Sequence, residues 1–76
     1  RLDKIFRSAV LTIKHNEDMV IIKTISHTAT VCGMAITNAK LDNIAGILTG
    51  NDTIYITVED KSGLEKLVSE IKSIIR

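Results

Sequence analysis

The chain has 76 residues and a formal net charge of +1, with basic and acidic residues interleaved along it. Because proteins that grip nucleic acid usually carry a stripe of spare positive charge, this composition argues against DNA binding by this segment alone. Its single cysteine, Cys32, excludes an internal disulfide framework and a cysteine-cluster zinc site. A domain this small buries only about 60–65% of the surface of its unfolded chain, so we expect one domain that is completed by oligomerisation.

The N-terminal part of the chain predicts a short helical segment and a β-hairpin. Residues 1–7 read as a short helix or as the end of an interdomain linker, and the domain proper is expected over residues 8–76. Ala9–Lys14 and Met19–Ile25 are strand-like runs separated by a polar turn, which predicts two paired antiparallel strands.

A helix is predicted over Thr28–Asn38, with Ser26 as a candidate cap. Three threonines and a glycine lower its intrinsic helix propensity, so packing against the rest of the domain must hold it. Helical spacing places its apolar stripe at Cys32, Ala35, Ile36 and Ala39, and a different face at Thr30, Gly33, Met34 and Thr37.

A second hairpin follows, in which Ile44–Leu48 and Thr53–Val58 flank the turn Gly50-Asn51-Asp52-Thr53. Gly, Asn and Asp tolerate the left-handed backbone of a tight hairpin turn, so we expect that conformation here. Ser62 and Glu65 form a capping box ahead of a strongly amphipathic helix. The apolar positions of that helix are Leu64, Leu67, Val68, Ile71, Ile74 and Ile75.

The element order β-β-α-β-β-α predicts an α+β fold with two layers, in which two helices cover one face of a four-stranded sheet. This arrangement is the one called DCoH-like. The stretch Met19-Val20-Ile21-Ile22 is apolar on both faces of its strand. A two-layer domain buries only one face of its sheet, so we expect another subunit to cover the other face.

Residue types that commonly act in enzyme active sites are sparse in this chain. His15 falls in a predicted turn, and His27 lies near a helix N-terminus, where the helix dipole disfavours the imidazolium form. Cys32 reads as a buried small residue. No catalytic triad, metal-ligand spacing or glycine-rich phosphate loop is recognisable. The sequence therefore predicts no enzyme, no metal site and no cofactor.

Asp52 is the charge that the second hairpin presents. A turn aspartate most often hydrogen-bonds to its own backbone, and the local sequence favours that interpretation. The alternative depends on the first long helix: if its face with Thr30, Gly33 and Thr37 points towards a neighbouring subunit, the turn meets that subunit too. This arrangement predicts a small-ligand site at a subunit boundary.

Three stretches of the chain resemble the C-terminal domain of the bacterial arginine repressor family. They are Val20-Ile21-Ile22-Lys23-Thr24, His27-Thr28-Ala29 and Gly46-Ile47-Leu48-Thr49-Gly50-Asn51-Asp52-Thr53-Ile54. The last is similar to the family's Gly-Thr-Ile-Ala-Gly-Asp-Asp-Thr-Ile signature, and the resemblance covers residues 8–76. It implies a cytoplasmic transcriptional repressor of arginine metabolism, an expectation that the free cysteine and the lack of a secretion signal support.

The resemblance also implies an assembly and a ligand. In the family this domain forms trimers that stack into hexamers, and L-arginine binds at the trimer–trimer interface as corepressor. A separate N-terminal winged helix-turn-helix domain, outside this chain, binds operator DNA. The polar ligand positions of the family fall on Thr30, Thr37, Asn51 and Asp52.

Three of these four positions depart from the family pattern. The usual glutamine is Thr30, one usual aspartate is Thr37 and another is Asn51; the usual glycine before the helix is His27. Guanidinium pairs bidentately with carboxylate, and each hydrogen bond to a charged group contributes about 1.5–3 kcal/mol, or roughly ten- to hundredfold in affinity. We therefore expect a domain that oligomerises as a trimer or hexamer but binds L-arginine weakly or not at all.

The same observations leave two alternative classes of protein open and predict one partner. A ferredoxin-like amino-acid-sensing module remains an alternative, and a helix between residues 8 and 25 would favour it. A small enzyme of pterin-dehydratase-like fold is a second alternative, which requires clustered histidines. If arginine binding is weak, a paralogous arginine-sensing subunit in mixed hexamers is the expected partner.

Overall fold

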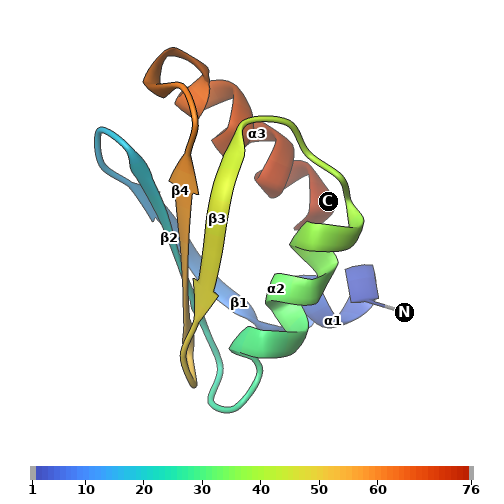
Figure 1. Ribbon diagram of the computed structural model, residues 1–76. Coiled ribbons are helices and arrows are strands. Elements are labelled where there is room, and N and C mark those ends of the chain that lie inside the picture. Colours follow the sequence, from blue (N-terminus) through green and yellow to red (C-terminus); the bar gives the residue numbers. More distant parts are fainter. Residues whose placement is uncertain (1, 76) are drawn as a thin grey trace.

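The computed structural model describes residues 2–75, which form an antiparallel four-stranded sheet with helices on one of its faces (Figure 1). This confirms the expected two-layer α+β class and the order β-β-α-β-β-α, which follows one additional N-terminal helix. None of the helices in residues 2–75 combines the length and apolarity needed to cross a membrane. The elements are α1 (Leu2–Ala9), β1 (Val10–His15), β2 (Met19–Thr24), α2 (Ala29–Asn38), β3 (Ile44–Thr49), β4 (Thr53–Val58), a 3₁₀ turn η1 (Lys61–Gly63) and α3 (Leu64–Ile75).

The sheet has the strand order β1-β2-β4-β3, so each hairpin contributes one edge strand and one central strand. The central strands β2 and β4 pair in a register that sets Val20 opposite Ile56 and Ile22 opposite Ile54. All four side chains are fully buried against the helix layer, where period-two alternation places them together. No helix lies between Val10 and Thr24, which contradicts the ferredoxin-like alternative.

The helix layer contains α1 as well as the two predicted helices. Helix α1 packs against α2 and α3 and buries Phe6 completely. On α2, the predicted apolar stripe is buried at Cys32, Ala35 and Ile36, whereas Ala39 is exposed because it lies beyond the last turn. The predicted stripe of α3 is buried at Leu64, Leu67, Val68 and Ile71 and partly buried at Ile74 and Ile75.

Both predicted helix caps are wrong. Thr28, not Ser26, occupies the cap position of α2, and its hydroxyl donates to the carbonyl of Ile25 (2.8 Å) instead of capping the helix. At the other helix, the carboxylate of Asp60 accepts from the backbone N–H of Ser62 (3.0 Å). An aspartate two residues earlier therefore takes the capping role from Ser62 and starts a 3₁₀ turn before α3.

The left-handed backbone that the sequence predicts for the β3–β4 turn is absent there and occurs at His27 instead. None of Gly50, Asn51 and Asp52 has a positive φ, whereas His27 has φ 68°. The β3–β4 turn is closed by its own hydrogen bond from the N–H of Gly50 to the carbonyl of Thr53 (2.8 Å) and is also held from outside. The carbonyl of Asp52 accepts from the N–H of Thr24 (2.8 Å) and that of Asn51 from the N–H of Ala29 (3.3 Å). Because neighbouring segments hold this turn, it does not need the self-contained I′ geometry that a free two-residue hairpin uses.

The sheet face opposite the helices is uncovered within residues 2–75. It is apolar over β3, β4 and the first part of β2, whereas Thr12, Lys14 and Lys23 make the β1 side of the same face polar. Leu48 is 70% exposed and Tyr55 is 40% exposed on this face, and Met19 and Ile21 are half-buried. The absence of a side chain at Gly46 leaves a hollow of about 290 Å³ beside Leu48. We call this surface the open sheet face; it comprises Met19, Ile21, Gly46, Leu48, Tyr55 and Thr57.

Candidate functional site

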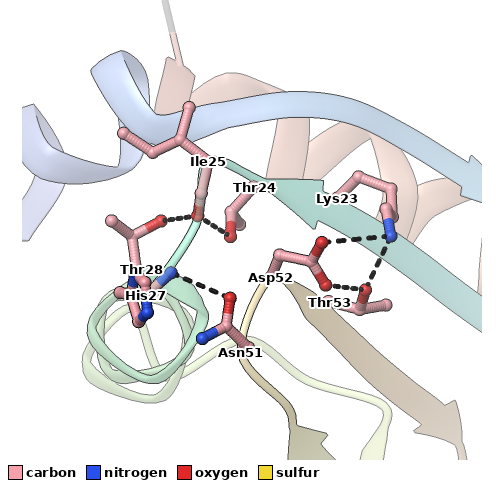
Figure 2. Close-up of polar contacts among 8 residues, drawn as sticks. All are labelled: Lys23, Thr24, Ile25, His27, Thr28, Asn51, Asp52 and Thr53. Carbon is pink, nitrogen blue, oxygen red and sulfur yellow. Dashed lines mark hydrogen bonds and ion pairs between the residues drawn. The ribbon is translucent and has the colours of Figure 1, made fainter.

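The site is built where three segments meet at one end of the sheet. The end of β2, the loop between β2 and α2, and the β3–β4 turn lie side by side there (Figures 1 and 2). The two backbone hydrogen bonds from Thr24 and Ala29 to the turn hold them together. We call this cluster the turn–helix site; it comprises Lys23, His27, Thr30, Asn51, Asp52 and Thr53.

Asp52 is held in a three-membered polar network, as Figure 2 shows. The hydroxyl of Thr53 donates to its Oδ1 (2.9 Å), and Lys23 Nζ lies 3.6 Å from its Oδ2. Lys23 Nζ also donates to Thr53 Oγ1 at 3.0 Å, which closes the triangle. The hydrogen bond from Thr53 and the charge of Lys23 lower the pKa of Asp52 below its ordinary value, so the carboxylate is ionised at neutral pH.

Asn51 connects the turn to the loop before α2. Its side-chain Oδ1 accepts a hydrogen bond from the backbone N–H of His27 at 3.1 Å (Figure 2). His27 adopts a left-handed backbone, which costs a non-glycine residue about 1–2 kcal/mol. The hydrogen bond from Asn51 is one of the contacts that hold His27 in this unfavourable conformation.

Thr30 and Thr37 lie at different distances from the turn. Thr30 is in the first turn of α2, and its Oγ1 lies 3.4 Å from Oγ1 of Thr49 on β3. The hydroxyl of Thr37 donates to the carbonyl of Gly33 (3.1 Å), within the helix. Thr37 is seven residues beyond Thr30, or about 10 Å along the helix axis. Within one subunit Thr30 therefore lies beside the last residue of β3, which leads into the turn with Asn51 and Asp52, whereas Thr37 lies further along the helix.

Gly33 allows this close approach of α2 to the sheet. A Cβ at this position would lie 2.9 Å from Thr49 Cγ2, so a side chain there would force either α2 or Thr49 to shift. The predicted face with Thr30 and Thr37 is thus partly directed at the edge strand of its own subunit. The exposed Met34 continues that face outward, away from the core.

Sequence reasoning missed three contributors to the site. Lys23 and Thr53 are opposite one another in the β2–β4 register, a pairing that depends on the strand order and not on either strand alone. The third missed contributor is the backbone of His27. The sequence did contain a signal for it, because His27 stands where the family pattern has a glycine. A positive φ is a common physical reason for glycine at a loop position.

The other reactive groups lie away from this site. His15 is at the end of β1, opposite Val20 near the start of β2, whereas His27 follows the far end of β2. The two histidines therefore share no pocket, and the clustered arrangement that a pterin-dehydratase-like enzyme requires is not formed. Burial raises the pKa of the Cys32 thiol, against a smaller lowering by its hydrogen bond with Thr28. Residues 2–75 contain no cluster of three or more His, Cys, Asp or Glu side chains that would hold a metal ion.

Fold and site together define a small α+β domain whose polar hairpin turn is joined to the start of the following helix. The family model described as "Arginine repressor, C-terminal domain" matches residues 6–73. The chain therefore belongs to the arginine repressor C-terminal domain family.

Curated relatives agree with this assignment. The chain is 36% identical over 74 residues to the arginine repressor of Thermotoga petrophila, which covers 97% of this chain and 49% of the relative. It is 35% identical over 75 residues to that of Clostridium acetobutylicum, covering 99% and 50%, and 33% identical over 76 residues to that of Symbiobacterium thermophilum, covering 100% and 51%. The relatives are named as regulators and not as enzymes, and the chain spans about half of their length.

Proposed function

We propose that this chain is the assembly and ligand-sensing part of a transcriptional repressor of arginine metabolism. The observation that carries the proposal is the open sheet face, where Leu48 is 70% exposed beside the hollow at Gly46. Contiguous apolar surface of this kind marks a protein interface in a soluble domain. A homo-oligomer, trimer or hexamer, covers this face with further copies of the chain, and DNA is bound through a separate domain.

The proposed L-arginine site lies at the turn–helix site and is weakened. Asp52 is its one carboxylate, and Asn51 stands where the family has a second one. The shorter side chains Thr30 and Thr37 replace longer hydrogen-bonding groups, and the hydroxyl of Thr37 is already bonded to its own helix. Because a guanidinium needs charged, bidentate partners for strong binding, these changes support weak binding of L-arginine at this site.

Sedimentation velocity of the chain with and without millimolar L-arginine tests both parts of this proposal. We expect an oligomer in the absence of arginine and an unchanged distribution in its presence. A monomer under both conditions would contradict the assembly role. A shift from trimer to hexamer that requires arginine would leave assembly standing and contradict the weakened site.

A partner follows from the weakened site. A repressor subunit that assembles without sensing arginine needs a second source of arginine response, and a paralogous subunit with two turn carboxylates supplies it in a mixed oligomer. Co-expression with such a paralogue, followed by affinity purification through a tag on one subunit, tests this. Recovery of homo-oligomers alone would contradict the mixed assembly.

A further inference from the structure

The electrostatic balance of the turn–helix site depends on Lys23. Lys23 and Asp52 carry the only formal charges of the site when His27 is neutral, so the site has no net charge. Both are about half-exposed, at 49% and 48%, and a ligand from solvent therefore reaches the carboxylate and meets the ammonium beside it.

Both oxygens of the Asp52 carboxylate already have partners within the chain. Oδ1 accepts from the Thr53 hydroxyl and Oδ2 faces Lys23 Nζ (Figure 2). The bond from Lys23 Nζ to Thr53 Oγ1 holds the ammonium over this pair, since Lys23 and Thr53 are opposite in the strand register. A guanidinium that binds a carboxylate through two parallel hydrogen bonds needs both oxygens, and here the ammonium of Lys23 already faces one of them, Oδ2.

On the basis of the proposed function, we propose that Lys23 is a specificity-determining residue that acts as an internal counter-ion: it neutralises Asp52 and thereby disfavours ligands with a cationic end group. Together with the neutral Asn51, it removes the net negative charge that would select a guanidinium. The site then discriminates little between a guanidinium and an uncharged ureido group of the same shape.

The expected size of the effect follows from the exposure of the pair. Removing the ammonium by Lys23→Gln tightens L-arginine binding about two- to fivefold, because half-exposed ion pairs contribute little individually. Asn51→Asp adds a second carboxylate and tightens binding about ten- to hundredfold. The double variant K23Q/N51D binds L-arginine more tightly than either single variant.

Isothermal titration of the whole chain with L-arginine, and with L-citrulline as its uncharged isostere, tests the proposal. We expect Lys23→Gln to tighten arginine binding and to leave citrulline binding unchanged, which separates a charge effect from a steric one. Lys23→Arg keeps the positive charge and should not tighten arginine binding. Lys61→Gln removes the same charge at η1, at the far end of β4, and serves as the control for net charge.

Two results would overturn the proposal. One is equal arginine affinity for K23Q/N51D and N51D; the other is the same gain for citrulline as for arginine in K23Q. A carboxyl NMR titration adds a readout that needs no ligand, because the pKa of Asp52 should rise in K23Q and not in K61Q. An unchanged pKa would contradict the internal counter-ion even if binding were too weak to measure. Failure of the proposed assembly appears separately, as a monomer in sedimentation.

Discussion

The side-chain oxygen of Asn51 lies 3.1 Å from the backbone nitrogen of His27 and accepts its hydrogen bond, which joins the β3–β4 turn to a residue with left-handed backbone. The polar turn is therefore a structural joint as well as a candidate ligand site. A carboxylate at position 51 would accept the same hydrogen bond, so the joint is compatible with the family's aspartate. What the asparagine changes is the charge and not the fold.

Replacing His27 with glycine should stabilise the domain. The left-handed conformation costs a non-glycine residue about 1–2 kcal/mol, and glycine avoids this cost. Glycine also loses more conformational entropy on folding, so the expected net gain in the free energy of unfolding is about 0.5–1 kcal/mol. Thermal unfolding should show a midpoint several degrees higher. Thr28→Gly is the matched control, because Thr28 has φ −116° and gains nothing from glycine. A lower midpoint for His27→Gly would contradict the strain at this residue.

Removing the acceptor at position 51 should destabilise the joint. Asn51→Ala leaves the N–H of His27 without this partner and should lower the free energy of unfolding by about 1 kcal/mol. Asn51→Asp keeps an acceptor oxygen and should retain the wild-type stability at neutral pH. Urea denaturation measures both. Equal stability of the alanine variant and the wild type would show that the loop is held by its other contacts.

A methyl group at position 33 should separate α2 from β3. Gly33→Ala improves helix propensity by about 1 kcal/mol, yet its Cβ would lie 2.9 Å from Thr49 Cγ2, and overpacking of this kind costs about 1–3 kcal/mol. We expect net destabilisation. Thr49→Ser removes the opposing methyl group, so the double variant should recover stability. A double-mutant cycle by chemical denaturation that shows no coupling would contradict the contact.

The acid sensitivity of the domain should depend on Asp52. Because the folded-state pKa lies below the ordinary value of 3.8, the contribution of Asp52 to stability is fully present above that value and is lost as the pH falls through the folded pKa. The first cause is the hydrogen bond from Thr53, so Thr53→Val should raise the pKa of this carboxyl towards its ordinary value. Carboxyl NMR titration checks the shift. An unchanged pKa of Asp52 in that variant would contradict the role of the Thr53 hydroxyl.

A charge on the open sheet face should break the assembly. Leu48→Glu places a carboxylate at the most exposed apolar residue of the open sheet face, and an oligomer that buries this face would have to desolvate it. We expect a shift from oligomer to monomer in sedimentation velocity. Leu11→Glu makes the same change at a residue that is 62% exposed on the edge strand β1 and should leave the oligomer intact. The reverse pattern would place the interface at the β1 edge.

Local sequence patterns were sufficient to predict the helices and strands but not the residues that cap the helices. Alternation in Thr53–Val58 and helical spacing in α3 predicted those elements correctly, since each pattern depends on a residue's own neighbours. The predicted caps at Ser26 and Ser62 were wrong for different reasons: α2 begins after Thr28 without a side-chain cap, and Asp60 accepts the backbone N–H of Ser62 ahead of α3. Local chemistry offers several caps, and packing selects among them.

The amino-acid sequence by itself determined the α+β class, the two hairpins and the family. It also determined that the turn lacks a second carboxylate. Each of these depends on patterns among residues that are close to one another along the chain. Only the tertiary structure decided that Lys23 lies beside Asp52 and Thr53, since these contacts require the distant strands β2 and β4 to be neighbours in the sheet. It also placed the left-handed backbone at His27 and not in the turn. Interactions between distant segments set both outcomes, because the β3–β4 turn is held by hydrogen bonds from Thr24 and Ala29 as well as by its own residues.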